Sequence, residues 1–176
     1  LSSFQNEFLL ERGLPEPNHY GVSELKLDRF FNFKFFNEIQ SNCLSTLLYS
    51  NRSMVISSPT GSGKTVLFEL GFIRIIHYME AIKSRKIKAV YLSPIKALCQ
   101  EKLREWKEKF QLNFNDIGVA ELTGDTEAEE QENFQEANLI ITTPEKWDAI
   151  TRKWRDYFGV VSHIALLMID EVHLLN

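Results

Sequence analysis

Two short stretches of the chain contain residue types that can bind phosphate, hold a metal ion and activate water. The first reads Ser-Pro-Thr-Gly-Ser-Gly-Lys-Thr. Its glycines let backbone N–H groups close around phosphate oxygens without a Cβ in the way, its lysine can reach the β- and γ-phosphates, and its last hydroxyl can ligate Mg²⁺. A glycine of the general pattern is replaced by serine at the first position. The stretch therefore predicts a nucleoside triphosphate site made by Ser58, Pro59, Thr60, Gly61, Ser62, Gly63, Lys64 and Thr65.

The residues on either side of this loop also suit a phosphate site. Such a loop lies between a strand and a helix, because the helix N-terminus then faces the anion. The apolar run Met54–Ser57 predicts the strand, and Lys64–Ala81 predicts a buried helix. The alternative is a chance turn rich in glycine and serine. The intact Gly-x-Gly-Lys-Thr and the two flanks favour the phosphate loop.

The second stretch is acidic and follows an uninterrupted apolar run. Ile164–Ile169 predicts a strand buried on both faces of a parallel sheet, and Asp170-Glu171-Val172-His173 comes directly after it. Open α/β sheets bind ligands beyond the carboxyl ends of their strands. One carboxylate can hold Mg²⁺ and its neighbour can orient or deprotonate the attacking water. The alternative, a solvated strand end, is less favoured behind a buried strand and a phosphate loop.

The composition is typical of a globular protein and does not indicate a disulfide-rich, secreted or membrane protein. The 176 residues are 44% hydrophobic and 12% aromatic, enough for one α/β domain with a real core. Since the net charge is −4, a nucleic-acid surface would have to be local. Cys43 and Cys99 form no disulfide framework and no metal spacing, which favours a reduced intracellular setting. We expect no signal peptide, no membrane span and no membrane partner.

Strands and helices are predicted to alternate, which is typical of βαβ units around a parallel sheet. An irregular N-terminal arm, residues 1–28, is expected before them. The predicted strands are Met54–Ser57, Ala89–Leu92, Val119–Leu122, Leu139–Thr142 and Ile164–Ile169. The predicted helices are Asn37–Tyr49, Lys64–Ala81, Ala97–Phe110, Glu127–Phe134 and Glu145–Arg152. The expected fold is an α/β P-loop NTPase domain with helices on both faces of the sheet.

Three turns follow predicted strands and are expected on one edge of the sheet. Two of them join a hydroxyl and a proline to a helix start, where free N–H groups can hold an anion. Together they can grip consecutive phosphates of a nucleic-acid strand, although ordinary N-capping explains any one of them alone. The basic and aromatic run Thr151–Arg155 suits strand binding and a solvated helix end equally. The candidate contacts are Ser93, Pro94, Lys96, Thr123, Gly124, Thr143, Pro144 and Lys146.

Gln40 lies near the start of the helix that precedes the phosphate loop. Its side chain carries both a donor and an acceptor, so it can read the adenine edge. Taken alone, a glutamine in this position is more often an exposed helix residue.

The whole set of motifs resembles the first RecA-like domain of a superfamily 2 DExH-box helicase. The resemblance covers residues 30–176, and its details are most similar to the meiotic crossover-promoting branch of the Ski2-like group, whose members are nuclear DNA helicases. The stretches that carry the branch are Phe36–Ser41, Pro94–Cys99, Pro144–Asp148 and Thr151–Arg155. Splicing and exosome relatives share most of these motifs, so an RNA helicase stays open.

The resemblance implies a role for each site residue. Gln40 would contact the adenine of ATP, Lys64 and Thr65 would serve phosphate and Mg²⁺, Asp170 would hold Mg²⁺, Glu171 would activate water, and His173 would couple hydrolysis to a second domain. The implied partner is single-stranded or branched DNA, along which the enzyme moves 3′ to 5′ in the nucleus. A nucleotide-gated clamp that binds without unwinding is an alternative from another class, but such a clamp has no need of Glu171.

The resemblance also indicates what the chain does not contain. A family member needs a second RecA-like domain with an arginine finger, and a further strand after the DExH motif. We therefore expect residues 29–176 to be an incomplete first RecA-like domain, truncated on its C-terminal side. Because one face of the hydrolysis site is missing, the isolated chain is expected to be inactive.

Overall fold

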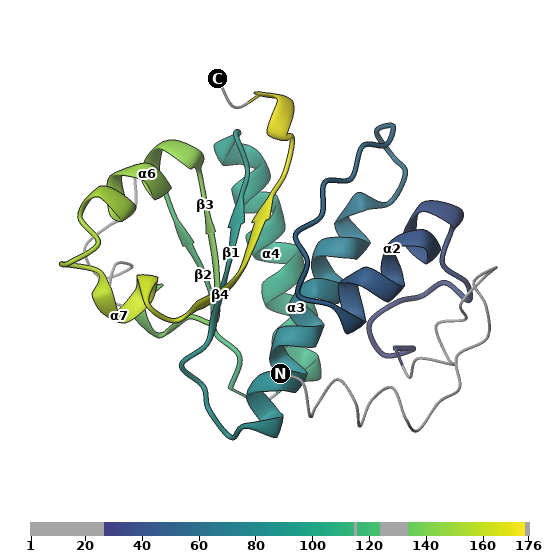
Figure 1. Ribbon diagram of the computed structural model, residues 1–176, viewed down its shortest axis with the longest axis horizontal. Coiled ribbons are helices and arrows are strands. Elements are labelled where there is room, and N and C mark those ends of the chain that lie inside the picture. Colours follow the sequence, from purple (N-terminus) through teal and green to yellow (C-terminus); the bar gives the residue numbers. More distant parts are fainter. Residues whose placement is uncertain (1–26, 115, 124–133, 175–176) are drawn as a thin grey trace. The chain divides into compact units, whose positions relative to one another are not determined.

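The computed structural model describes residues 27–114, 116–123 and 134–174. The chain divides into two compact units, Leu1–Ile82 and Lys83–Asn176, which are described separately below (Figure 1). Nearly all of the expected arm 1–28 lies outside the described residues, as do Gly124 and the predicted helix Glu127–Phe134 except its last residue.

The first unit is built on two helices, α2 (Glu38–Tyr49) and α3 (Lys64–Ala81), which pack against each other. Both were predicted from the sequence, α3 with its observed bounds. Asn37 caps α2, and its side chain and that of Gln40 bond each other's backbone N–H in a capping box. A helix that is apolar on several faces must be covered, and α3 buries the residues Leu67, Leu70, Phe72, Ile73, Ile76 and Met79.

The predicted strand Met54–Ser57 is wrong. The segment has no regular structure, and Val55 is 91% exposed. A strand exists only where a neighbouring backbone supplies a hydrogen-bond ladder. Within the described ranges, all ladder pairs belong to strands between Lys88 and Ile169, so an apolar run alone was not sufficient.

The second unit contains a parallel sheet of four strands in the order β2-β3-β1-β4. The strands are β1 (Lys88–Leu92), β2 (Val119–Leu122), β3 (Leu139–Thr142) and β4 (Ile164–Ile169). The last three have the predicted bounds, and β1 begins one residue earlier than predicted. Short apolar runs between turn signals were therefore enough to locate these strands.

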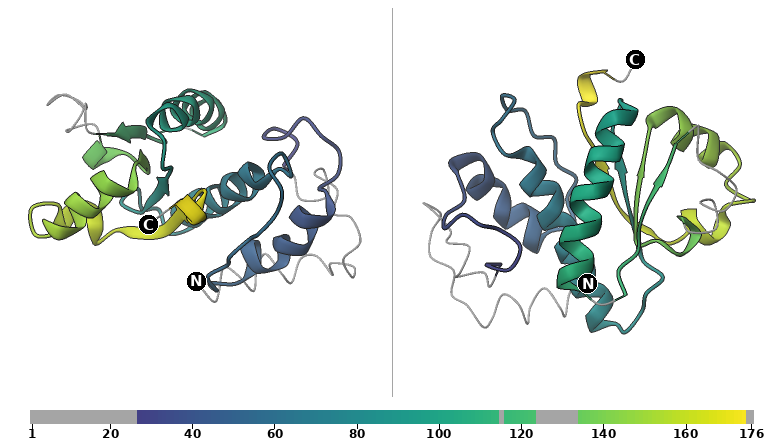
Figure 2. Two further views of the ribbon diagram at one scale, coloured as in Figure 1. Left: turned by 90° about the horizontal axis from the view of Figure 1, so that it is seen from above. Right: turned by 180° about the vertical axis from the view of Figure 1, so that it is seen from behind.

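Helices cover both faces of this sheet, as expected (Figure 2). On one face lies α4 (Lys96–Asn113), and on the other lie α6 (Pro144–Arg152) and α7 (Phe158–Val161). Successive residues of β1 serve opposite faces: Val90 packs with Ile150 and Val160, whereas Tyr91 meets Trp106 of α4. The four-residue α7 is too short to leave a helical period in the sequence, and it was not predicted.

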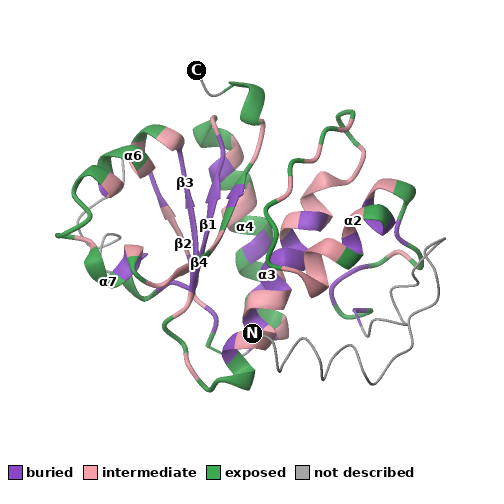
Figure 3. Cartoon of the chain, viewed as in Figure 1, coloured by how far each residue is buried: buried purple, intermediate pink, exposed green. Residues whose placement is uncertain are grey.

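The expectation that β4 is buried on both faces is wrong. Burial alternates along this strand, with Leu167 46% and Ile169 37% exposed (Figure 3). The physical reason is position: in the part of the chain that the structure describes, β4 pairs with β1 on one side only. The central strands β1 and β3 are buried throughout.

Both cysteines are free thiols, in agreement with the lack of a disulfide pattern. Burial, with the nearby charge of Glu121, raises the pKa of Cys99 to about 11. Across the described ranges, no helix combines the length and the apolar character needed to cross a membrane.

Candidate functional site

The loop Ser58–Thr65 adopts a backbone that its glycines permit. Gly61 and Gly63 have φ of 81° and 82°, in the left-handed region where a Cβ is unfavourable. Ser58 has no such φ, so a serine is acceptable where the general pattern has glycine. Its hydroxyl lies 2.7 Å from that of Ser62 and forms a hydrogen bond across the loop.

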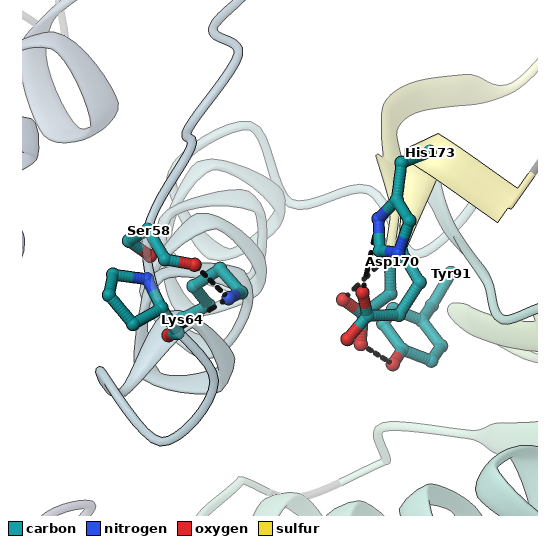
Figure 4. Close-up of polar contacts among 7 residues, drawn as sticks. Ser58, Lys64, Tyr91, Asp170 and His173 are labelled. Atoms are coloured by element: carbon teal, nitrogen blue, oxygen red, sulfur yellow. Dashed lines mark hydrogen bonds and ion pairs between the residues drawn. The ribbon is translucent and has the colours of Figure 1, made fainter.

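Lys64 opens α3 and turns its side chain back over the loop. Its Nζ donates to the carbonyl oxygens of Ser58 at 2.7 Å and Pro59 at 3.2 Å (Figure 4). Gly63, the N-cap of α3, makes no side-chain cap, so the first N–H groups of a long helix begin at the loop. A cation and a helix N-terminus therefore converge in the geometry that binds anions.

The first turn of α2 grips the same loop. Asn37 Nδ2 donates to the Ser62 carbonyl at 2.8 Å, and Gln40 Nε2 donates to the Gly63 carbonyl at 3.1 Å. Gln40 Oε1 accepts from the Asn37 backbone N–H at 3.0 Å, so both ends of this amide have partners within the first unit.

The grip changes the interpretation of Gln40. Only 5% of the surface of Gln40 is exposed, so Gln40 is not the exposed helix residue that its position in the sequence alone indicated. Its contact with adenine stays a prediction. The role of Asn37 was missed, although an Asn followed three residues later by Gln is a capping-box signal that points to both residues.

In the second unit, the carboxyl ends of all four strands fall on one line. Thr142 is the register partner of both Leu92 and Leu122, and Leu92 is also the partner of Ile169. The residues that come next are Thr123, Thr143, Ser93 and Asp170. The structure thus brings three predicted nucleic-acid residues and the predicted metal ligand to one edge of the sheet.

Asp170 is held at three points by its own unit. Its backbone N–H continues the β1–β4 ladder to the Leu92 carbonyl at 2.9 Å. Its Oδ1 accepts from the Glu171 N–H at 2.9 Å, and its Oδ2 accepts from the Tyr91 hydroxyl at 2.7 Å (Figure 4). Burial, followed by the hydrogen bond to Asp170, raises the pKa of Tyr91 well above its usual range. Tyr91 is therefore a neutral donor at physiological pH, and sequence reasoning missed it because a tyrosine inside a strand reads as core.

Glu171 and His173 follow Asp170 in a strained turn. Glu171 has φ of 47°, a left-handed conformation that costs a residue with a side chain about 1 kcal/mol or more. The short helix η2 (Val172–Leu174) places His173 Nδ1 3.4 Å from Glu171 Oε2. The turn thus places the His173 imidazole beside the Glu171 carboxylate, directly after Asp170 at the end of β4.

The predicted nucleic-acid residues differ in exposure. Ser93, Thr123 and Thr143 are buried, whereas Lys96 is exposed and Lys146 is half-buried. No side chain caps α4 or α6, so N-capping by the turn hydroxyls is not their function. Gly124 is outside the described residues.

Comparison with known proteins identifies the family. Residues 37–176 match the DEAD/DEAH box helicase family. The chain belongs to this family. The matched range includes the phosphate loop, the three turns and the carboxylates after β4, so the resemblance noted in the sequence is confirmed.

The chain is similar to named relatives and to a solved structure. It is 49% identical over 150 residues to human "Probable ATP-dependent DNA helicase HFM1", covering 84% of this chain and 10% of the relative. It is 47% identical over 156 residues to "ATP-dependent DNA helicase homolog MER3" of Arabidopsis thaliana, covering 83% and 13%. The fold matches the DUF1998 helicase MrfA bound to DNA and AMPPNP with a TM-score of 0.72 at 22% identity, over 90% of this chain and 23% of that one. The chain thus spans about a tenth of the length of the curated relatives it matches.

The two glycines of the loop provide a matched pair of variants. A Cβ on Gly63 would lie 2.4 Å from Gln40 Nε2, whereas nothing lies within 4 Å of a Cβ on Gly61. Both alanines suffer the same left-handed strain, but only Gly63→Ala displaces Gln40. In the full-length protein we expect Gly63→Ala to weaken binding of a fluorescent ATP analogue about fivefold more than Gly61→Ala does. A fivefold difference corresponds to the loss of one hydrogen bond worth about 1 kcal/mol.

The control for this pair removes the obstacle. In a Gln40→Ala background the two alanine variants are expected to bind the analogue equally. If Gly61→Ala and Gly63→Ala already bind equally in the otherwise unchanged protein, the grip of α2 on the loop does not influence nucleotide binding.

Gln40 can be tested for base choice with Asn37 as its control. Since Gln40 holds the loop and is expected to contact adenine, Gln40→Ala should weaken the binding of both ATP and GTP. The loss should be larger for ATP than for GTP. Asn37→Ala removes its contact with the loop and its cap of α2 but keeps the Gln40 amide, so it should weaken binding of the two nucleotides equally. Competition binding of ATP and GTP measures both effects, and equal losses in Gln40→Ala would leave the loop contact as its whole role.

Proposed function

We propose that this chain is the nucleotide-binding part of an ATP-dependent DNA helicase that moves 3′ to 5′ along one strand and acts in the nucleus on meiotic recombination intermediates. Residues 29–176 belong, in this proposal, to the first RecA-like domain, and a second RecA-like domain supplies the arginine finger. The relatives that support the proposal are several times longer than this chain, so the activity is that of the longer protein.

The observation that carries the proposal is the alignment of the four strand ends. An anion-binding edge with two uncapped helix starts supports contact with successive phosphates of a nucleic-acid strand. Asp170 and Glu171 continue the same edge, which supports coupling between nucleic acid and hydrolysis.

The residues at hand fit Mg²⁺. This ion usually takes one or two carboxylates, with phosphate oxygens and water completing its shell, and it does not need a cage of protein ligands. Asp170 offers an oriented, half-exposed carboxylate, and no group of three or more ligating side chains exists in the described ranges. When bound, Mg²⁺ neutralises phosphate charge in the transition state.

The chain's own residues supply the remaining steps. Lys64 exchanges its two carbonyl acceptors for phosphate oxygens, which are charged and therefore stronger acceptors. The Thr65 hydroxyl would be a ligand of Mg²⁺ at the phosphate loop. Glu171 accepts a proton from the attacking water. The Nδ1 atom of His173 lies 3.4 Å from the Glu171 carboxylate, and through this contact His173 would couple hydrolysis to the second domain.

The kind of nucleic acid is supported by the relatives. The two described above bear the words "DNA helicase" in their names, which favours DNA over RNA. An RNA helicase of the splicing or exosome type is the second candidate, because the motifs at the sheet edge are shared. A clamp that binds without unwinding is disfavoured by Glu171, whose strained backbone has no purpose in a pure clamp.

Glu171→Gln separates binding from hydrolysis in the full-length protein. The variant keeps Asp170 and Lys64, so binding of ATP with Mg²⁺ should stay within about twofold, while loss of the base should lower ATP turnover about 10²-fold or more. A matched variant, Glu101→Gln on the exposed side of α4, should behave as the unchanged protein. Normal turnover in Glu171→Gln would remove Glu171 from the mechanism.

Activation by matched polymers decides between the candidate functions. Single-stranded DNA and RNA of the same sequence are added to the full-length protein, and ATP turnover and strand separation are measured. We expect DNA to stimulate turnover more than RNA and ATP to drive unwinding. Stronger stimulation by RNA would favour the RNA helicase, and nucleotide-dependent binding without stimulation would favour the clamp.

A further inference from the structure

The Tyr91 hydroxyl reaches from one strand to the acidic end of the next. Tyr91 lies on β1 as the register partner of Met168 on β4, and its hydroxyl donates to Asp170 Oδ2 at 2.7 Å (Figure 4). The other oxygen, Oδ1, accepts from the Glu171 N–H at 2.9 Å. With a donor on each oxygen, the plane of the carboxylate is determined and the group does not rotate freely.

The tyrosine is itself held in place. It is 1% exposed, and its ring meets Trp106 of α4 edge to face, with the centroids 4.8 Å apart and the planes at 76°. Trp106 is also 1% exposed and packs on Phe110. A rigid aromatic group anchored in the core therefore carries the hydroxyl, so the position of Asp170 is tied to the helix α4.

We propose that Tyr91 is a positioning residue for the divalent-cation ligand Asp170. The inference rests on the proposed function, in which Asp170 holds Mg²⁺. The hydroxyl uses one lone pair of Oδ2 and fixes the direction of the others, so the carboxylate meets the cation without first having to be ordered. Outer-shell hydrogen bonds of this kind typically affect metal affinity or activity about 10- to 100-fold.

The Tyr91–Asp170 bond can also be regarded as a simple tie between β1 and β4. The two roles differ in what Tyr91→Phe changes. Phenylalanine keeps the ring and its contact with Trp106, and it removes one oxygen. A tie would alter stability alone, whereas a positioning residue alters the Mg²⁺ concentration at which nucleotide binds.

The test uses the full-length protein and a fluorescent ATP analogue, titrated at a series of Mg²⁺ concentrations and in EDTA. In Tyr91→Phe, the Mg²⁺ concentration that gives half-maximal binding should rise about tenfold, while affinity in EDTA stays unchanged. The matched control is Tyr157→Phe, since Tyr157 packs on Phe134 at the opposite face of the sheet. A midpoint within twofold of the unchanged protein overturns the proposal.

Two further variants separate this proposal from the assignment on which it depends. Asp170→Asn should raise the Mg²⁺ midpoint by itself, and adding Tyr91→Phe to it should have no further effect. If Asp170→Asn leaves the midpoint unchanged, the metal assignment fails; if it raises the midpoint and Tyr91→Phe does not, only the positioning role fails. Trp106→Phe, which loosens the ring contact, should raise the midpoint in the same direction by a smaller factor, and it gives a result even if Tyr91→Phe does not fold.

Discussion

In-register parallel pairing is the constraint on which the chemistry of the second unit depends. Leu122, Thr142, Leu92 and Ile169 are ladder partners, so whatever follows them reaches the same edge. The pairing decides the faces as well as the ends. Side chains alternate along a strand, so a slip of one residue would turn Tyr91 away from α4 and separate its hydroxyl from Asp170.

The alternation divides the labour between the two faces of the sheet. On one face, Val90 and Leu92 build an apolar cluster with α6 and α7. On the other, Tyr91 and Trp106 form an aromatic contact whose polar end leaves the core at Asp170. The same strand therefore contributes both to stability and to the site, because its odd and even residues have different neighbours.

The phosphate loop depends on a different kind of support. Its two left-handed glycines allow the turn, but the carbonyls of Ser62 and Gly63 are held by side chains from the first turn of α2. A capping box that serves its own helix thereby also positions a loop more than twenty residues later. Under the proposed function, the Gln40 amide both contacts adenine and holds the Gly63 carbonyl of the loop. A shift of this side chain would therefore alter the base contact and the loop together.

Much of the fold and of the site was predictable from local sequence. Backbone conformation and apolar periodicity depend on residues close in sequence. The sequence therefore predicted the glycine-permitted loop around Gly61 and Gly63, the bounds of the helix Lys64–Ala81 and the bounds of three of the four strands. The carboxylates after Ile169 were expected at the ligand-binding edge because parallel strands share a carboxyl edge. The sequence alone therefore determined the family, while the roles of its site residues stay predictions.

Only the tertiary structure decided what depends on distant partners. Among the described residues, Met54–Ser57 has the composition of a strand but pairs with no other strand, and β4 has the composition of a central strand but pairs with β1 alone. Tyr91 and Asp170 are 79 positions apart, and neither residue type indicates the other. Hydrogen bonds, edge positions and burial are properties of pairs of segments, so they are determined only when the chain has brought those segments together.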